Sequence, residues 1–185
     1  MPMIWLTSDL HFNHDKEFIW KARGFNSVQE MNSAILKRYS EVVKPEDTVF
    51  ILGDLMLGQR EDESLELIKA LPGQKIVIRG NHDTNRRISL YQNIGINVYD
   101  AWRFNSHGYH FYLSHYPTLT GNLEKESLKQ CELNLFGHTH QTENFFYDLP
   151  YMYHVGVDSH DCYPVSINRV IEDMECKVRE CKESL

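Results

Sequence analysis

The residues best suited to chemistry gather in five short segments, each following an apolar run of the chain. They are Asp-Leu-His at 9–11, Gly-Asp at 53–54, Gly-Asn-His-Asp at 80–83, a histidine at 115, and Gly-His-Thr-His at 137–140. Carboxylates, imidazoles and amide oxygens bind divalent metal ions such as manganese, iron, zinc and cobalt. None of the segments contains cysteine, which argues against a thiolate zinc site.

The last of these segments shows why the spacing matters. In extended backbone, residues two positions apart point to the same side, so His138 and His140 can face one site. Gly137 allows the backbone to turn or to approach another group closely. Taken alone, the segment is explained equally well by a polar loop after a buried strand. The five segments together, each at the end of an apolar run, indicate a metal site at one edge of a sheet.

The hydrophobic pattern predicts the elements that position these segments. Short apolar runs predict strands at 3–8, 47–52, 75–80, 96–104, 110–114 and 132–137, with a weaker one at 151–157. Apolar stripes of helical period predict helices at 27–43, 61–73, 84–95 and 166–180. Ser27 and Glu30 have the spacing of a capping box at the start of the first helix. Alternating strands and helices predict an α/β fold.

Size and charge limit the classes of protein and partner. The 185 residues, 42% hydrophobic and 24% charged, predict a single domain over 1–185. A net charge of −7 argues against duplex nucleic acid or an anionic membrane as a partner. It is compatible with a small phosphorylated substrate, including a nucleotide, held by bound metal. The charge says nothing about oligomeric state.

The cysteines and the apolar segments bear on the compartment. Cys131, Cys162, Cys176 and Cys181 are scattered and form no C-x-x-C pair, so no disulfide framework is expected. No apolar run approaches transmembrane length, and the apolar stretch near the start is too short for a signal peptide. These features lead us to expect a cytoplasmic protein.

The ordered segments resemble the calcineurin-like metallophosphoesterase superfamily, whose pattern is D-x-H, G-D, G-N-H-[D/E], H and G-H-x-H. All five blocks are present between Asp9 and His140. Residues 8–54 further resemble the small single-domain bacterial and phage phosphoesterases of that superfamily. The stretch HVGVDSHDCYPVSI at 154–167 resembles their C-terminal segment, although His154 stands where asparagine is expected.

This resemblance implies a fold and a metal centre. The fold is α/β, with two mixed β-sheets packed as a sandwich and flanked by helices in an α/β/β/α arrangement. Two divalent transition-metal ions are implied, manganese first, with iron, zinc, cobalt or nickel as alternatives. The first ion is assigned to Asp9, His11 and His140, the second to Asn81, His115 and His138, and Asp54 bridges both.

The resemblance also implies hydrolysis of a phosphomonoester or phosphodiester. Two metals about 3.5–4 Å apart can share a hydroxide that attacks phosphorus. His82 is the expected general acid, oriented by Asp83, whose carboxylate favours the imidazolium. The alternative for His82 is a structural role in capping its loop. Arg23 and His14 are expected to bind the substrate phosphate. Their alternatives are a surface salt bridge for Arg23 and a solvated or core-facing His14.

Two other functions remain open at this stage. A non-catalytic metal-binding scaffold for protein interactions could keep the same fold, but it could dispense with His82 and some of the ligands. A metallo-β-lactamase-like hydrolase would need an H-x-H-x-D-H string, and Gln141 follows His140 instead. The sequence does not distinguish monoesters from diesters, and it leaves the roles of His107, His110, His154 and His160 open.

Overall fold

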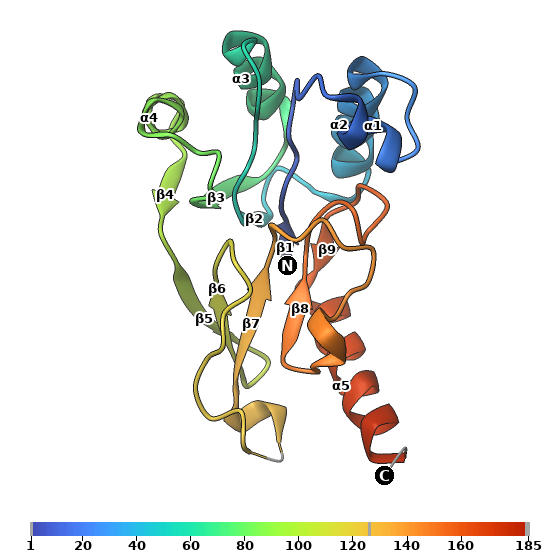
Figure 1. Ribbon diagram of the computed structural model, residues 1–185. Helices are drawn as coiled ribbons and strands as arrows, with labels where there is room; N and C mark the ends of the chain where they lie inside the picture. Colours follow the sequence, from blue (N-terminus) through green and yellow to red (C-terminus); the bar gives the residue numbers. More distant parts are fainter. Residues whose placement is uncertain (1, 126, 184–185) are drawn as a thin grey trace.

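The strands form two mixed sheets in the computed structural model, which describes residues 2–125 and 127–183 (Figure 1). The first sheet has the order β4-β3-β2-β1-β9 and the second β5-β6-β7-β8. The strands of the first sheet are β1 (Ile4–Thr7), β2 (Thr48–Ile51), β3 (Gln74–Ile78), β4 (Asn97–Tyr99) and β9 (Val165–Ser166). Those of the second are β5 (Trp102–Ser106), β6 (Tyr109–Leu113), β7 (Glu132–Phe136) and β8 (Met152–His154).

Helices flank the sheets, as the predicted fold class requires. They are α1 (Glu17–Ala22), α2 (Val28–Val42), α3 (Glu61–Ala70), α4 (Asn85–Asn93) and α5 (Ile167–Glu183), with short 3-10 turns η1 (Leu128–Gln130) and η2 (Phe146–Asp148). The first turn of α2 has the predicted cap, because Ser27 accepts a hydrogen bond from the backbone of Glu30 at 3.1 Å. No helix in the described part of the chain is long and apolar enough to cross a membrane.

The first sheet buries both of its faces, because successive strand residues point to opposite sides. Val49 and Ile51 of β2 pack with helices α2 to α4, whereas Phe50 of the same strand packs against the second sheet and α5. The two hydrophobic clusters therefore form one layer on each side of the first sheet.

One predicted strand is two. The run at 96–104 was expected to be continuous, but β4 belongs to the first sheet and β5 to the second, with residues 100–101 between them. The apolar pattern continues through the crossing because both strands are partly buried, so it does not reveal the change of sheet. The sequence also gave no sign of α1 or of β9, which are short. All four cysteines are free, as expected.

Parallel pairing brings the five chemical segments to one edge. Strands β1, β2 and β3 run parallel, as do β6 and β7. The two sheets also meet at this edge. The amide of Val157, which follows β8 of the second sheet, donates to the carbonyl of Ser8, which follows β1 of the first sheet, at 3.2 Å. Each predicted ligand segment thus follows the carboxyl end of a strand, and the ends lie together.

Asp47 fixes the other end of the strands that carry the first ligands. Its carboxylate accepts hydrogen bonds from the Met3 amide at 2.7 Å, the Lys44 amide at 2.9 Å and the Trp5 indole at 3.0 Å. The backbone hydrogen bond from Met3 is the main cause that holds the pKa of Asp47 below its usual value. This carboxylate therefore ties the start of β1 to the turn that leads into β2.

We expect Asp47→Ala to lower the free energy of unfolding by about 1–3 kcal/mol, because three donors lose their acceptor. Since the folded-state pKa is depressed, the contribution is present above the unfolded pKa and is lost as the pH falls through the folded pKa. Urea unfolding should therefore show the full difference at pH 7 and a shrinking one below about pH 4. Glu46→Ala, at an exposed neighbour, is the control. Equal stability of Asp47→Ala and wild type at pH 7 would contradict this role.

Candidate metal centre

One carboxylate oxygen, Oδ2 of Asp54, lies between two groups of ligand atoms. The Nε2 atom of His115 is 3.6 Å from it and the Nε2 atom of His11 is 3.8 Å from it. Asp54 and both histidines are buried. A single oxygen that faces a histidine from each group has the placement that a bridging ligand needs.

The first group contains the residues predicted for one metal ion. Asp9 Oδ1 lies 3.8 Å from Nε2 of His11 and 3.9 Å from Nε2 of His140. The two imidazole nitrogens are themselves 3.2 Å apart. Three ligand atoms from two distant parts of the chain thus face a common point.

The second group is built around Asn81. Its Oδ1 atom is 2.8 Å from Nε2 of His115 and 2.9 Å from Nδ1 of His138. Together the two groups and Asp54 include every residue predicted as a ligand, from five separate loops. The structure therefore brings the whole predicted set together.

The electrostatics of these atoms fit a divalent cation. Oδ1 of Asp9 is buried and has no hydrogen-bond partner among the described residues. Burial lowers the pKa of His11 well below its usual value, so its ring is neutral and a lone pair is available. Burial also raises the pKa of Asp54 to about 7. A bound cation would favour the ionised carboxylate and satisfy the orphaned oxygen.

The backbone at the ligands is strained. A positive φ is uncommon outside glycine and costs about 1–3 kcal/mol per residue. Five of the predicted ligands have φ between 49° and 68°: Asp9, His11, Asp54, His138 and His140. Backbone hydrogen bonds hold two of them, since the Asp9 amide donates to the carbonyl of Gly53 and the His11 amide to that of Asp54, both at 3.0 Å.

Gly137 lies close to Ser8 and Asp9, in agreement with the close backbone approach predicted for this glycine. A Cβ atom at this position would lie 1.8 Å from the Ser8 hydroxyl and 2.5 Å from Oδ2 of Asp9. The same Asp9 oxygen accepts a hydrogen bond from the His138 amide at 2.9 Å. The absence of a side chain at 137 therefore lets the last ligand segment dock onto the first.

Behind the first group lies an ion pair that the sequence did not reveal. Nδ1 of His140 is 2.9 Å from Oδ2 of Asp158, and Nε of Arg23 is 2.9 Å from Oδ1 of the same carboxylate. Burial opposes ionisation of Asp158, but the hydrogen bond from His140 and the charge of Arg23 outweigh it and hold its pKa well below the usual range. The only signal for Asp158 was its place in the family-like segment at 154–167.

Arg23 was expected to bind the substrate phosphate, but the structure places it in a buried ion pair with Asp158. Its side chain is only 2% exposed, and its Nη2 atom also donates to the carbonyl of Asp9 at 2.9 Å. These bonds engage the guanidinium inside the protein, where it holds Asp158 behind His140. Contact with a substrate phosphate would require breaking them. His14, by contrast, is half-buried, with its ring 5.3 Å from that of His11.

His82 faces the open side of the centre. Its side chain is 41% exposed, and its Nε2 atom is 4.0 Å from Oδ2 of Asp54. Burial is the largest of the effects that lower its pKa, and the charge of Arg87 lowers it further, while Asp83 acts in the opposite direction. The ring is therefore closer to neutral than the sequence suggested.

Asp83 acts on the backbone and not on the ring of His82. Its carboxylate accepts hydrogen bonds from the amides of Gly80 at 2.8 Å and Asp54 at 2.9 Å, and from the Tyr91 hydroxyl at 3.0 Å. Among the described residues, no hydrogen bond joins the side chains of Asp83 and His82. Asp83 thus fastens the loop that carries Asn81 and His82 to the loop that carries Asp54.

The remaining histidines lie outside the ligand set. His154 is fully buried; its Nδ1 atom is 2.9 Å from the Ser159 hydroxyl, and its Nε2 atom has no partner among the described residues. Nε2 of His160 is 2.9 Å from the His154 carbonyl oxygen. His107 and His110 are exposed in the β5–β6 hairpin.

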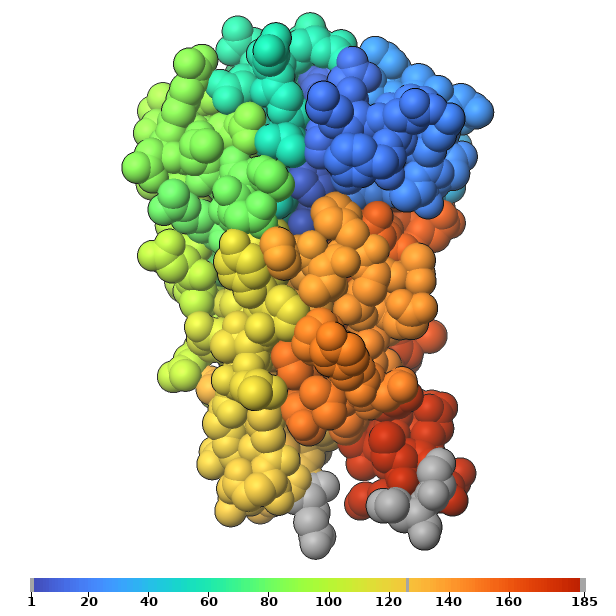
Figure 2. Space-filling view, in the orientation of Figure 1, coloured from blue at the N-terminus to red at the C-terminus, as the bar shows by residue number. Residues whose placement is uncertain are grey.

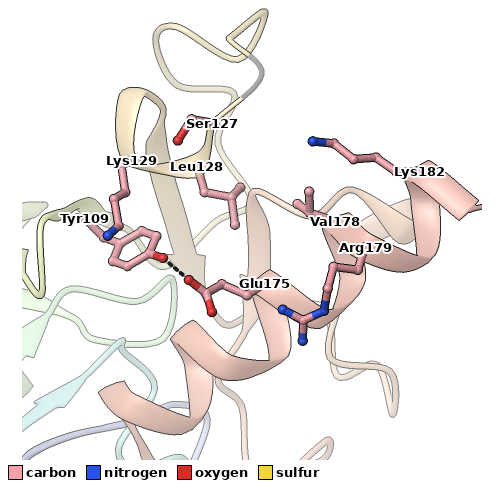
Figure 3. Close-up of a pocket in the computed structure, with 8 residues that line it drawn as sticks. All are labelled: Tyr109, Ser127, Leu128, Lys129, Glu175, Val178, Arg179 and Lys182. Atoms are coloured by element: carbon pink, nitrogen blue, oxygen red, sulfur yellow. Dashed lines mark hydrogen bonds between the residues drawn. The ribbon is translucent and has the colours of Figure 1, made fainter.

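A hollow elsewhere on the surface, between η1 and α5, is lined by none of the predicted ligands (Figure 3). The hydrogen bond from Tyr109 to Glu175 closes part of it.

Comparison with known proteins shows which family the chain is similar to. Residues 3–155 match the model of the calcineurin-like phosphoesterase superfamily domain. An uncharacterised protein of Methanocaldococcus jannaschii, MJ1445, is 33% identical over 132 residues, which cover 63% of this chain and 75% of that protein. The gene 66 protein of Mycobacterium phage D29 is 29% identical and covers 95% of this chain and 98% of its own. The crystal structure of AQ665, a protein of unknown function from Aquifex aeolicus, has a TM-score of 0.71 at 29% identity, covering 93% of this chain and 99% of that one.

The ion pair behind His140 leads to a test of metal binding. Asp158→Asn should weaken binding of an ion that Asp9, His11 and His140 would hold by roughly 10–100-fold, because the variant no longer fixes the tautomer and direction of His140. Titration of metal-free protein against a chromophoric chelator measures this affinity for each ion. Asp161→Asn, at a carboxylate that pairs with Arg38 on the surface, is the control. Unchanged affinity in Asp158→Asn would show that the ion pair does not position the ligand.

Proposed function

The chain belongs to the calcineurin-like phosphoesterase superfamily, and on this premise we propose that it hydrolyses a small phosphate ester at a centre of two divalent metal ions. The observation that carries this proposal is the position of Asp54, whose Oδ2 atom lies 3.6 Å from His115 and 3.8 Å from His11. A site for one ion would not need a carboxylate oxygen that faces both groups.

The residues present fit two ions. Asp9, His11 and His140 would hold the first, Asn81, His115 and His138 the second, and Asp54 would belong to both. When bound, such ions supply Lewis-acid chemistry, since they polarise a phosphoryl oxygen and lower the pKa of water. The mixture of imidazole, carboxylate and amide ligands suits manganese, iron, zinc or cobalt better than magnesium or calcium. The family resemblance adds nickel to these candidates and places manganese first.

The side chains of the chain divide the remaining tasks. His82 lies at the open side of the centre, where its Nε2 atom can carry a proton to the leaving oxygen. Asp83 positions His82 indirectly, because it holds the backbone of that loop against Asp54. Arg23 and Asp158 stay behind His140 and fix the direction of its ring. A non-catalytic scaffold would have no use for an exposed imidazole directly beside the bridging carboxylate.

The bridging role of Asp54 can be tested by metal analysis. We expect the protein reconstituted with manganese to bind close to two equivalents, and Asp54→Ala to lose affinity for both. Asp158→Asn, which contacts a ligand of one ion, should affect mainly that one. Elemental analysis after dialysis, together with a panel of phosphate monoesters and diesters, makes the comparison. Two tightly held ions in Asp54→Ala would rule out the bridge, and no hydrolysis of any ester by the metal-loaded protein would rule out the proposed activity.

Removal of His82 should slow hydrolysis according to the leaving group. His82→Ala should keep its metals and lose roughly 10²–10⁴-fold in kcat/KM on alkyl esters, the usual contribution of a positioned acid. The loss should be smaller on 4-nitrophenyl esters, because a good leaving group needs little protonation. The measurement is kcat/KM across esters graded by leaving-group pKa, with metal content checked in parallel. An equal loss at every pKa would mean that His82 positions the substrate and does not donate the proton.

A further inference from the structure

A cavity of about 730 Å³ adjoins the metal centre. It lies between the segment after β1, the segment after β2 and the first turn of α4, whose blue, teal and green surfaces adjoin in Figure 2. The first two segments continue from the loops that carry Asp9, His11 and Asp54. The cavity therefore extends outward from the same strand ends that build the centre.

Two residues of the cavity lining lie against residues of the centre. The ring of His14 lines the cavity and lies 5.3 Å from the ring of the ligand His11. Arg87 lines it on another side, and its Nη1 atom donates to the backbone carbonyl of His82 at 2.7 Å. If His82 protonates the leaving oxygen, the departing group leaves the phosphorus on this side.

Both arginines of the cavity lining are paired with glutamates outside it. Nε of Arg87 is 3.1 Å from Glu61, and Nη1 of Arg60 is 3.4 Å from Glu63. Lys16 has no ion pair within the described residues, but Asp15 lies next to it in the lining. Neither arginine is therefore free to bind a second phosphate group, and Lys16 is the one cationic side chain of the lining without an ion pair among the described residues.

Hydrogen-bonding groups remain free in the lining. The side chains of Lys16 and Gln59 have no hydrogen-bond partner among the described residues. A volume of about 730 Å³ falls in the usual range of about 300–1,000 Å³ for sites that hold a small organic molecule. The rest of the lining is mainly apolar, so it matches a bulky group that combines flat apolar surface with a few hydroxyls or amides.

We propose that this cavity receives the leaving alcohol of the substrate, and that this alcohol is bulky, polar and uncharged, of the size of a nucleoside. The proposal rests on the phosphoesterase function proposed above. In the reaction the bond between phosphorus and the alcohol oxygen breaks, water supplies the oxygen that joins phosphorus, and the alcohol oxygen takes its proton from His82. Esters of small alcohols would leave most of the cavity empty and should be poorer substrates.

Two phosphodiesters with the same retained group test this. One releases 2-methoxyethanol, and the other releases a nucleoside through its primary 5′ hydroxyl, so that the two leaving oxygens are similar. We expect the metal-loaded wild type to favour the nucleoside ester. Gln59→Trp, which fills the cavity from an exposed position, should lower kcat/KM on that ester by about tenfold or more, mainly through KM, and lower it far less on the methoxyethyl ester.

A second variant and a control complete the kinetic test. Lys16→Ala removes a free donor from the wall and should raise KM for the nucleoside ester in the same selective way. Gln130→Trp introduces the same bulk at an exposed glutamine, the last residue of η1, and should leave kcat/KM on both esters unchanged. Equal losses on the two esters in Gln59→Trp, or no preference in wild type, would overturn the assignment of the cavity.

Binding of the free alcohol gives a readout that needs no turnover. The nucleoside should shift NMR signals of residues 13–16 and 57–60 in the wild type, and Gln59→Trp should weaken this binding. If the protein hydrolyses phosphate esters but binds no nucleoside here, the cavity proposal fails and the phosphoesterase function stands. If the metal-loaded protein hydrolyses monoesters of the panel but neither of these diesters, the leaving-group role fails and the proposed function stands. If it hydrolyses no ester at all, both fail.

Discussion

The structure depends on one electrostatic constraint, which is that two carboxylates and four imidazoles share a space of a few ångströms. Burial disfavours the charged forms of these groups, since it raises the pKa of Asp54 to about 7 and lowers that of His11. A bound divalent ion would favour the ionised carboxylate and satisfy the buried oxygen of Asp9. Metal binding at this site would therefore be linked to protonation.

The fold satisfies this constraint at the price of local strain. Parallel strands of two different sheets end at one edge, which brings loops from distant parts of the chain together. The ligands then turn inward through left-handed backbone conformations at Asp9, His11, Asp54, His138 and His140. Hydrogen bonds between neighbouring loops hold these conformations, and Gly137 permits the closest of the approaches. The buried sheets on either side provide the rigidity that keeps the loops in place.

The polar side chains around the centre are either enclosed behind it or accessible from solvent. Arg23 and Asp158 are enclosed, bonded to each other and directed at the back of His140, so they act on the ligand geometry. His82 and His14 are both half-buried on the open side, and His14 also lines the large cavity, so both can meet a substrate. Asp83 acts through the backbone, because it binds the amides of Gly80 and Asp54. The same residue types thus serve positioning or chemistry according to their access to solvent.

The sequence by itself determined the order of the candidate ligand segments and the elements that precede them. The D-x-H, G-D, G-N-H-D and G-H-x-H segments can be read directly from the sequence, and their assignment to metal ions is what the family resemblance implies. The four longer helices could be predicted because local periodicity depends only on near neighbours. Tertiary structure alone decided the division of 96–104 between two sheets, the burial of Arg23 and the bonding of Asp83 to backbone amides and not to His82. It also decided the partnership of Asp158 with His140, residues from separate loops that a local pattern cannot connect. Residue type alone does not show whether an arginine or a carboxylate is exposed or buried, because tertiary packing determines its solvent access and its partners.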